Sequence, residues 1–560
     1  MPAIKGGSFL IEERDPASVF TAEDLSPEHL AIARTADEFW ANEVIPHLDA
    51  IQHQEPGAAV RALRKSAELG LTSMAIPEAY GGLELDLASA MVVAEHVARD
   101  GSYAAWHGAH TGIGTLPLVF FGTEEQKRKY LPKLATAEMV AAYALTEPHA
   151  GSDALAARTR ADLSADGTHY VLNGQKMWIT NGGAADLFTV FAKIGGEQFT
   201  AFLVERAFGG VTSGAEEKKM GIKGSSTTAV YFDNVRVPVE NVLGEIGRGH
   251  IIAFNILNIG RLKLGPFALG GAKNVLAVAL KYAKERKAFG SPIAAFGAIQ
   301  HKLAEMAIRI FATESMVWRT VGLIAPEESL KTIEEYAVEC SIVKVYASEM
   351  LDYVVDEGVQ IHGGYGYHQD YAVERAYCDS RINRIFEGTN EINRLLITGM
   401  LLKRAARGQL ALVAAAQKVV GQALSPSAAE GEAALVANAK NIALLAMGIA
   451  YRKFALELEK QQEVLMSIAD IVMEVFAMES ALLRVAKNGA GREFCAVFLR
   501  DAMSRIEFAA RNVLAASSEG DSLRMSLAML RRFVKYDPVD AVAMRREIAK
   551  RLLSAERYVA

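Results

Sequence analysis

The sequence predicts an α+β fold that is mainly α, with a small β domain between helical domains. Three observations support this prediction. Apolar residues recur at helical spacing over residues 28–142 and again over residues 251–405. Between them, over residues 143–250, short runs of β-branched and aromatic residues are separated by Asn-Gly and Gly-Gly turns. Over residues 406–560 the pattern is helical again, which predicts an additional helical bundle.

Residues 1–27 mix turn and extended signals, so we interpret them as an arm before the N-terminal helical domain. Within that domain, Gly108, Gly112 and Gly114 fall in a helix-like stretch. Each glycine in a helix costs about 1 kcal/mol relative to alanine. Three of them indicate close approach of a neighbouring helix or of a long thin ligand, and glycine alone favours helix packing.

The middle region predicts a small antiparallel sandwich or barrel, because several short strands follow one another without helices. The predicted strands cover residues 170–174, 187–192, 199–204 and 229–232. After residue 250, long amphipathic segments predict a four-helix bundle. These segments cover residues 251–283, 296–324, 328–358 and 390–404.

The C-terminal region contains an internal repeat. Residues 304–315 and 469–480 share Phe-Ala-x-Glu-Ser in register, at an offset of 165 residues, and Arg319 and Arg484 occupy equivalent positions. This match favours duplication of the bundle. The second copy has no counterpart of residues 384–392, so we expect a structural domain that covers a surface of the first bundle.

Composition and charge narrow the class of protein. The chain has 560 residues, 51% of them hydrophobic, and a net charge of −6, which gives no reason to expect a nucleic-acid partner. Three widely separated cysteines fit neither a disulfide framework nor a zinc site and favour a reducing compartment. No signal peptide and no apolar run of about 18 residues is visible. We expect a cytoplasmic, bacterial-type protein that can associate with a membrane, or a mitochondrial matrix protein whose transit peptide has been removed.

The stretch at residues 384–392 is the centre of the sequence argument. Glu387 follows Phe386 and precedes Gly388, where the backbone can turn sharply, and Thr389 can cap the next helix. Glu387 would then lie at a strained junction against apolar neighbours, where desolvation raises its basicity. Taken alone, a glutamate before a helix is more often a solvated residue that stabilises the helix dipole.

Two further motifs suit a flat ligand. Residues 143–153 form a loop that ends in Gly151-Ser152-Asp153, whose N–H groups and hydroxyl could hold an anion or the polar edge of a heterocycle. Trp178 and Thr180 lie two residues apart and would share one face of a strand, where a ring and a hydroxyl suit a flat redox group. A core tryptophan with a surface threonine is equally consistent with this spacing.

Two helix ends complete the set of motifs. Residues 285–290 carry a basic cluster before a glycine, which suits a pyrophosphate, and residues 360–366 contain three glycines that let a ligand approach the backbone. Each also has an ordinary explanation as the end of a helix.

Together these motifs closely resemble the acyl-CoA dehydrogenase family over about residues 30–405. Five motifs occur in the family's order, at residues 143–153, 176–183, 285–290, 360–366 and 386–392. Residues 217–223 and 258–261, together with the additional C-terminal domain, resemble the very-long-chain branch.

The resemblance implies an FAD-dependent enzyme that oxidises long-chain acyl-CoA to trans-2-enoyl-CoA in fatty-acid β-oxidation. It implies that Glu387 removes the α-proton while a β-hydride passes to flavin N5, and that the electrons pass to an electron-transfer flavoprotein. Two alternatives remain: an acyl-CoA oxidase that uses oxygen, and a respiratory-complex assembly or scaffold protein that keeps the fold.

The resemblance also implies roles for individual residues. FAD contacts fall on Tyr143, Leu145, Thr146, Gly151, Trp178, Ile179, Thr180, Thr389 and Glu391. Contacts to the FAD of a neighbouring subunit fall on Arg286, Phe289, Gln360, Gly363 and Gly364. Substrate contacts fall on Ser152, Asn258, Arg261, Phe386 and Gly388. Gly108 and Gly112 fall where the family's acyl tunnel runs, so the functional interpretation of these glycines overtakes helix packing.

Sharing of the FAD site between chains implies at least a dimer. The additional domain would replace the second dimer of a tetramer, which implies a homodimer. Residues 403–424 combine a basic flank with an amphipathic helix. Two interpretations stay open for them: peripheral membrane contact, as in the very-long-chain enzymes, and packing of the helix on its own domain.

Overall fold

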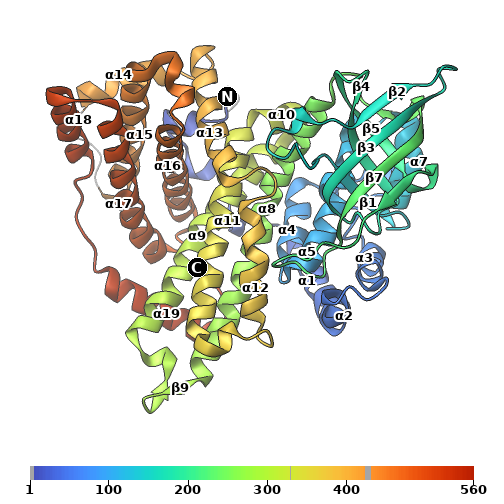
Figure 1. Ribbon diagram of the computed structural model, residues 1–560. Helices are drawn as coiled ribbons and strands as arrows, with labels where there is room; N and C mark the ends of the chain where they lie inside the picture. The colour runs from blue at the N-terminus through green and yellow to red at the C-terminus, as the bar shows by residue number, and fades with distance from the viewer. Residues whose placement is uncertain (1–4, 328, 423–430) are drawn as a thin grey trace.

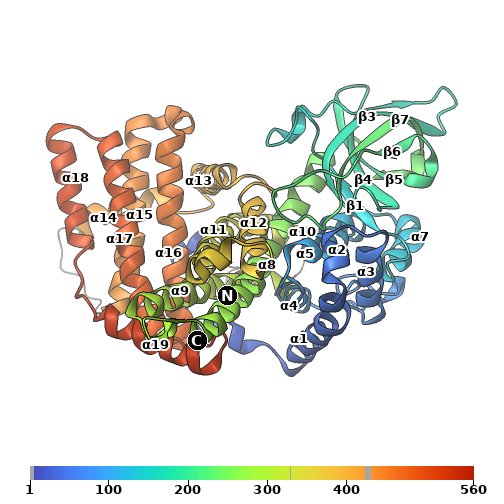
Figure 2. The ribbon, with the colours of Figure 1, turned by 60° about the horizontal axis from the view of Figure 1, so that its bottom comes forward.

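The computed structural model describes residues 5–327, 329–422 and 431–560, and it confirms the mainly helical α+β class. The N-terminal domain lies beside the sheet domain in both ribbon views (Figures 1 and 2). A capping box at Ser26 and Pro27 in the first turn begin its first helix. Its helices are α1 Pro27–Phe39, α2 Leu48–Gln52, α3 Ala58–Glu68, α4 Leu87–Val97, α5 Gly101–Gly108, α6 Leu116–Phe121 and α7 Glu124–Ala135, with π-helices at Trp40–Val44 and Ala109–Gly114.

The middle domain is one eight-stranded sheet in the order β6-β7-β3-β2-β4-β5-β8, with β1 paired to β4. The expectation of a purely antiparallel sheet is wrong, because β1 and β2 both run parallel to β4. All four predicted strand segments are found in strands. The strands are β1 Ala141–Ala144, β2 Arg160–Leu163, β3 His169–Thr180, β4 Leu187–Ile194, β5 Gln198–Glu205, β6 Val211–Ser213, β7 Thr227–Pro238 and β8 Val242–Leu243.

A helical bundle follows, built on the 37-residue helix α8, Gly249–Glu285. It also contains the short strands β9 Lys287–Ala288 and β10 Ser291–Pro292, and helices α9 Gly297–Ile324, α10 Leu330–Glu335, α11 Ala337–His362, α12 Ala372–Ser380 and α13 Asn390–Ala406. The prediction of one helix over 328–358 is wrong, because the backbone leaves the helical conformation at Tyr336 (φ −97°, ψ 23°) and divides the segment into α10 and α11.

The C-terminal domain occupies the side of the molecule opposite the sheet (Figure 1). Its helices are α14 Leu412–Gln422, α15 Gly431–Phe454, α16 Gln462–Asn488, α17 Arg492–Ser517, α18 Gly520–Phe533 and α19 Ala541–Ala555. Leu412 and Val419 of α14 are buried, and Ala416 lies close to Gly448 of α15. This packing supports the interpretation of α14 as a helix of its own domain. Residues 423 and 424, the end of the predicted amphipathic segment 403–424, lie outside the described residues.

Among the described residues, one helical segment, Gly431–Lys460, is long and apolar enough to cross a membrane. More than half of its apolar window is buried inside the protein. We therefore interpret α15, which begins this segment, as the core helix of the C-terminal domain.

The arm before α1 packs on the C-terminal domain. The rings of Phe9 and Phe476 lie 4.8 Å apart, and Lys487 Nζ donates a hydrogen bond to the carbonyl oxygen of Val19 (2.8 Å). Gly7 N–H donates to the Glu339 carboxylate of α11 (2.7 Å). The arm therefore connects the first bundle to the second.

The two repeat segments lie in α9 and α16 and bind one another reciprocally. Arg319 of α9 donates to Glu479 Oε2 (2.7 Å) and Ser480 Oγ (3.1 Å) of α16. The equivalent Arg484 of α16 pairs with Glu314 Oε2 (2.7 Å) of α9 and donates to Ser315 Oγ (3.4 Å). Each repeat thus offers its partner the same buried arginine, glutamate and serine, which supports the predicted duplication.

Aromatic rings also take part in this reciprocal contact between α9 and α16, which we call the reciprocal clasp. The Arg319 guanidinium lies 4.6 Å from the ring centroid of Phe476, and that of Arg484 lies 4.7 Å from that of Phe311. Phe311 and Phe476 are themselves equivalent residues of the two repeats. The cation–π contacts add to the charge pairing at both ends.

We expect Glu479→Gln to destabilise the protein by about 3–5 kcal/mol, because it leaves Arg319 and Lys440 buried without their shared counter-charge. Thermal unfolding monitored by circular dichroism should show a clearly lower Tm. The matched control is Glu507→Gln, which removes a surface pair with Arg511 on α17. Equal Tm values for both variants would contradict the structural importance of the clasp.

Candidate functional site

Glu387 lies at a strained turn between the bundle helices. Its φ is +58° and that of Gly388 is +82°, so two successive residues adopt the left-handed region. Thr389 caps α13 as predicted, with its hydroxyl accepting from Ile392 N–H (3.3 Å). A β-carbon at Gly260 of α8 would lie 2.6 Å from Glu387 Oε2. The missing side chain at Gly260 therefore makes room for the carboxylate.

The neighbouring cations hold the backbone of this turn. Arg261 Nε donates to the Glu387 carbonyl oxygen (3.1 Å), and Lys344 Nζ donates to that of Gly388 (2.8 Å). Asn393 Nδ2 also donates to the Gly388 carbonyl oxygen (2.8 Å). The turn is thus fixed through its carbonyl groups, while the Glu387 side chain takes no part in these bonds.

The electrostatics suit a base. Burial raises the pKa of Glu387 to about 7, although Arg261 and Lys344 act in the opposite direction. Part of the residue stays accessible, but Oε2 is buried and has no hydrogen-bond partner among the described residues. Burial also lowers the pKa of Lys344 to about 7. A carboxylate with a free lone pair and a pKa near neutrality can accept a proton from a weak acid.

Two predicted motifs meet at the edge of the sheet. Lys176 Nζ donates to the Leu145 carbonyl oxygen (3.0 Å), and Met177 N–H donates to that of Thr146 (2.9 Å). Tyr143 on β1 is buried, and burial, with a contribution from the Glu387 carboxylate, raises the pKa of its phenol well above the usual range. The structure therefore brings residues 143–146 beside residues 176–180.

Trp178 departs from the regular strand that the sequence predicts. The register of β3 shifts between Lys176 and Ile179, and Trp178 has φ +59°. This bulge leaves its side chain 54% exposed, whereas Ile179 is buried. Simple two-residue alternation fails here, but the bulge presents an aromatic face beside the predicted site.

The residues present fit the FAD that the sequence predicts. The exposed indole of Trp178 can stack on a flat ring, and the loop at Gly151 and Ser152 is exposed, with open space beyond Gly151. Thr227 pairs with Thr180 across β3 and β7, and its Oγ1 is buried without a hydrogen-bond partner among the described residues. Thr389 and the exposed Glu391 begin α13, whose N-terminus suits a phosphate group.

A second set of predicted FAD residues lies far from Glu387 in the same chain. Arg286 follows the last residue of α8, 26 positions after Gly260, so the helical rise separates them by about 39 Å. Figure 1 shows the adjoining hairpin with β9 far from the sheet. Gln360, Gly363 and Gly364 lie at the end of α11, where Arg286 lies over the ring of Tyr365. Phe289 is 97% exposed on the hairpin. The structure does not bring these residues to the Glu387 site within one chain.

The predicted substrate residues divide into two groups. Asn258 is buried one helical turn from Arg261, and its Oδ1 accepts from Arg261 Nη1 (2.9 Å), so both lie beside the Glu387 turn together with Phe386 and Gly388. Gly108 and Gly112 lie further along α8 from Gly260, beside Phe267 and Lys263. A β-carbon at Gly108 would lie 2.7 Å from the Phe267 ring. Close helix packing therefore accounts for Gly108, and its role in an acyl tunnel stays a prediction.

Sequence reasoning missed several supporting residues. Lys176 and Glu147 form a buried ion pair (2.7 Å), and Glu147 also accepts from the N–H groups of Arg158 (2.6 Å) and Thr159 (3.0 Å). Lys344 was also missed, and Gly260 was named only as part of the stretch 258–261, without its role in making room for the Glu387 carboxylate. Charged residues of opposite sign in the two motifs, Glu147 within 143–153 and Lys176 at the start of 176–183, were a signal for the first pair. No local signal marks Lys344, because its partners are distant in sequence.

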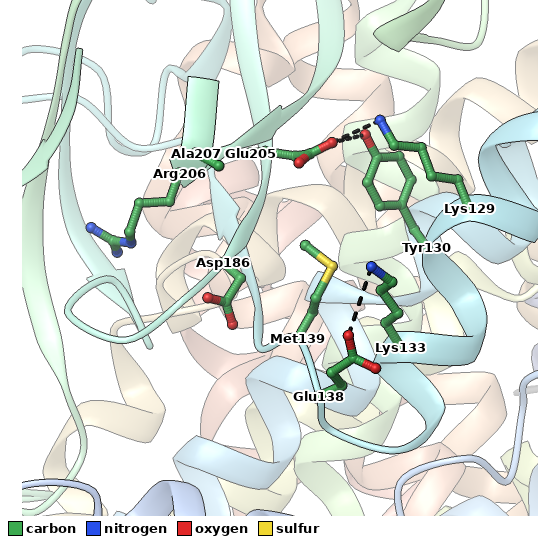
Figure 3. A pocket seen from close by; sticks show the side chains of 9 residues that line it. All are labelled: Lys129, Tyr130, Lys133, Glu138, Met139, Asp186, Glu205, Arg206 and Ala207. Atoms are coloured by element: carbon green, nitrogen blue, oxygen red, sulfur yellow. Dashed lines mark hydrogen bonds and ion pairs between the residues drawn. The ribbon is translucent and has the colours of Figure 1, made fainter. Parts of the chain in front are cut away.

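A separate cavity of about 230 Å³ contains none of the predicted site residues. It lies between α7 and the end of β5 (Figure 3). Its lysines are paired, Lys129 with Glu205 (2.8 Å) and Lys133 with Glu138 (3.7 Å), and Tyr130 donates to Glu205 (2.7 Å). We assign no function to this cavity, because its charges neutralise one another.

Comparison with known families and proteins gives a consistent result. The acyl-CoA dehydrogenase N-terminal domain matches residues 26–138, the middle domain matches residues 142–235, and two C-terminal domain models match residues 247–402 and 438–532. A probable acyl-CoA dehydrogenase of Bacillus subtilis is 49% identical, with 99% of this chain and 98% of that protein covered. The human very long-chain specific mitochondrial acyl-CoA dehydrogenase is 45% identical over 59% of this chain, which spans about half (51%) of that protein.

One solved structure matches the whole chain, and two others match about two thirds of it. The crystal structure of an acyl-CoA dehydrogenase complexed with FAD from Bacillus anthracis has a TM-score of 0.97 and 50% identity, and all of both chains is covered. Butyryl-CoA dehydrogenase from Megasphaera elsdenii has a TM-score of 0.64 and 36% identity over 68% of this chain and 99% of that chain. A chain in a structure of the electron transferring flavoprotein of Acidaminococcus fermentans has a TM-score of 0.63 and 36% identity, again over 68% of this chain and 99% of that chain.

We expect Lys344→Met to raise the pKa of Glu387 further above 7, because the ammonium stabilises the ionised carboxylate. Infrared difference spectroscopy of the carboxyl stretch against pH, with Glu387→Gln to assign the band, measures this shift. Lys550→Met on α19 is the control, since Lys550 is exposed and should leave the band unchanged. A pKa of Glu387 that stays the same or falls in Lys344→Met would contradict the electrostatic coupling.

Proposed function

Because the chain belongs to the acyl-CoA dehydrogenase family, we propose that it oxidises long-chain acyl-CoA to trans-2-enoyl-CoA and passes the electrons to an electron-transfer flavoprotein. The observation that carries this proposal is the Glu387 turn, in which a desolvated carboxylate with a pKa near 7 keeps Oε2 free. Glu387 would take the α-proton of the thioester.

The cofactor of this family is FAD, as in the full-length structural neighbour, and in the proposal Trp178, Thr180, Tyr143 and Thr389 would hold it. When bound, FAD supplies the acceptor for the β-hydride. The backbone N–H of Glu387 would stabilise the negative charge that develops on the thioester oxygen. The carbonyl contacts from Arg261 and Lys344 would hold this N–H and the carboxylate in a fixed relation.

Substrate length, electron acceptor and location belong to the proposal. The very long-chain relatives support a long substrate, and the flavoprotein structure from Acidaminococcus fermentans supports the acceptor. We place the protein in the cytoplasm of a bacterial-type cell. Peripheral membrane contact through residues 403–424 stays a prediction, and the burial of Leu412 and Val419 supports the alternative.

We propose a homodimer in which each chain completes the FAD site of the other. Arg286 lies about 39 Å along α8 from Gly260, which abuts Glu387, so it is too far to serve the same site within one chain. Gln360, Gly363 and Gly364 lie at the end of α11, next to the Tyr365 ring that Arg286 contacts, and Phe289 lies on the adjoining hairpin. The exposure of Phe289 and Tyr367 at that end supports an interface there.

Glu387→Gln should keep FAD and bind acyl-CoA but lose turnover by several orders of magnitude, because the amide cannot accept the α-proton. In the unaltered protein, the flavin reduction rate should rise as pH increases through about 7, where the carboxylate form becomes populated. Stopped-flow absorbance measures both. Substantial residual reduction in Glu387→Gln would assign the base to another residue.

Anaerobic titration with acyl-CoAs of increasing length should bleach the oxidised flavin most efficiently with long chains. Visible absorbance gives the end point, and added electron-transfer flavoprotein should restore the colour. Rapid reoxidation of the product-bound protein by oxygen would instead support an oxidase. A yellow protein that no acyl-CoA bleaches, and that co-purifies with a large membrane complex, would support a scaffold.

A further inference from the structure

Lys263 is a buried cation without a counter-charge on the helix that carries the Glu387 contacts. Its side chain is 7% exposed, and Nζ donates a hydrogen bond to Thr111 Oγ1 (2.7 Å). Thr111 donates its own proton to the His107 carbonyl oxygen (2.8 Å), so the hydroxyl accepts from Lys263. Among the described residues, no carboxylate lies within ion-pair distance of this ammonium. Burial lowers the pKa of Lys263 to about 8.

Another lysine on the same helix shows the usual arrangement. Lys273 lies between the carboxylates of Glu95 and Glu314, each 2.5 Å from Nζ. Buried charges in proteins are normally paired in this way, because an unpaired ammonium loses its hydration without compensation. Lys263 has only the Thr111 hydroxyl and a cation–π contact with the Phe267 ring, 5.8 Å from Nζ, to offset this loss. An anion beside the ammonium would supply the stronger compensation.

The surroundings of Lys263 combine a small residue, a helix distortion and polar groups. Thr111 and Gly112 belong to the π-helix Ala109–Gly114, a distortion that is frequent at functional sites. A β-carbon at Gly112 would lie 3.6 Å from Nζ, so the glycine keeps the space beside the ammonium open. His107 Nε2 bonds to the Leu71 carbonyl oxygen (3.1 Å), and its buried Nδ1 has no partner among the described residues. The ammonium of Lys263 and Nδ1 of His107 are therefore two polar groups in this region whose hydrogen bonding or charge pairing is incomplete.

The position of Lys263 relative to Glu387 follows from the geometry of α8. Gly260 abuts the Glu387 carboxylate, and Lys263 is three residues further along, a rise of about 4.5 Å. An acyl group with its α-carbon beside Glu387 has carbons only a few bonds further along its chain within reach of residues one turn away on α8. A hydrocarbon chain offers nothing to the ammonium, whereas a charged oxygen at its end would supply the missing counter-charge.

We propose that Lys263 and Thr111 form an anion subsite in the acyl compartment and that the enzyme accepts acyl-CoAs whose chain ends in a carboxylate. The proposal rests on the proposed function, because it places the α-carbon at Glu387. Thr111 orients the ammonium, and Gly112 leaves room for the carboxylate. Substrates of this class would bind through the terminal carboxylate in addition to the CoA moiety.

The test compares ω-carboxyacyl-CoAs with unsubstituted acyl-CoAs of equal length. Calorimetry measures their binding to full-length, FAD-loaded Glu387→Gln protein, with and without Lys263→Met, which removes the charge and keeps an unbranched side chain one atom shorter. We expect Lys263→Met to weaken binding of the ω-carboxy series about ten- to a hundredfold, as for loss of a charge-assisted hydrogen bond. Binding of the unsubstituted series should stay equal or tighten. Lys281→Met, at an exposed lysine of α8, is the matched control and should alter neither series.

A measurement of thermal stability and a second variant distinguish a specific loss of binding from a folding defect. Lys263→Met should raise the Tm of the free protein, since it removes an uncompensated buried charge, whereas a structural lysine would lower it. Thr111→Val, which keeps the side-chain shape, should weaken the ω-carboxy series by a smaller factor and leave the other series unchanged.

Several outcomes would overturn the proposal. Equal loss of both series in Lys263→Met would make Lys263 a packing residue. A preference of the unaltered protein for ω-hydroxyacyl-CoAs over ω-carboxy forms would assign the site to neutral groups. Oxidation of unsubstituted acyl-CoAs together with no binding of ω-carboxy forms would remove the subsite and leave the proposed function standing. Binding of no acyl-CoA would overturn both.

Discussion

The arrangement of the site depends on how two buried cations are used. Arg261 and Lys344 lie beside Glu387 but donate to the carbonyl oxygens of the turn, and the carboxylate is left unpaired. Direct ion pairs would lower the pKa of the glutamate and remove the free lone pair that a base needs. Binding through the backbone instead holds a left-handed turn in place and keeps the carboxylate basic. Gly260 belongs to the same constraint, because any side chain there would displace the carboxylate.

Much of this architecture could be predicted from the sequence, because the signals are local. Helical periodicity located α8, α9 and α13, and the Glu387 stretch was placed before a helix capped by Thr389. The bulge at Trp178 and the break at Tyr336 could not be predicted, because they depend on neighbouring strands and helices and not on residue type. The same reason applies to Lys344 and to the pair of Glu147 with Lys176. Their roles exist only once distant segments meet.

The division of the site between distant parts of α8 links the fold to assembly. One region of the helix supplies Gly260 and Arg261 to the base, and its far end leads into the hairpin with the exposed Phe289. A rigid helix cannot bring both regions to one cofactor, so its length sets the spacing between two sites in the proposed dimer. The packing of the bundle therefore also determines the position of the second subunit in the proposed dimer. The C-terminal domain extends this packing.

The reciprocal clasp between α9 and α16 has the pattern of an interface between identical partners, in which each side gives what it receives. Here both sides belong to one polypeptide. Joining them covalently replaces a concentration-dependent association by an intramolecular one, so this contact persists at any dilution. The second copy has no glutamate turn of its own. Its sequence can therefore diverge everywhere except at the residues that contact the first copy.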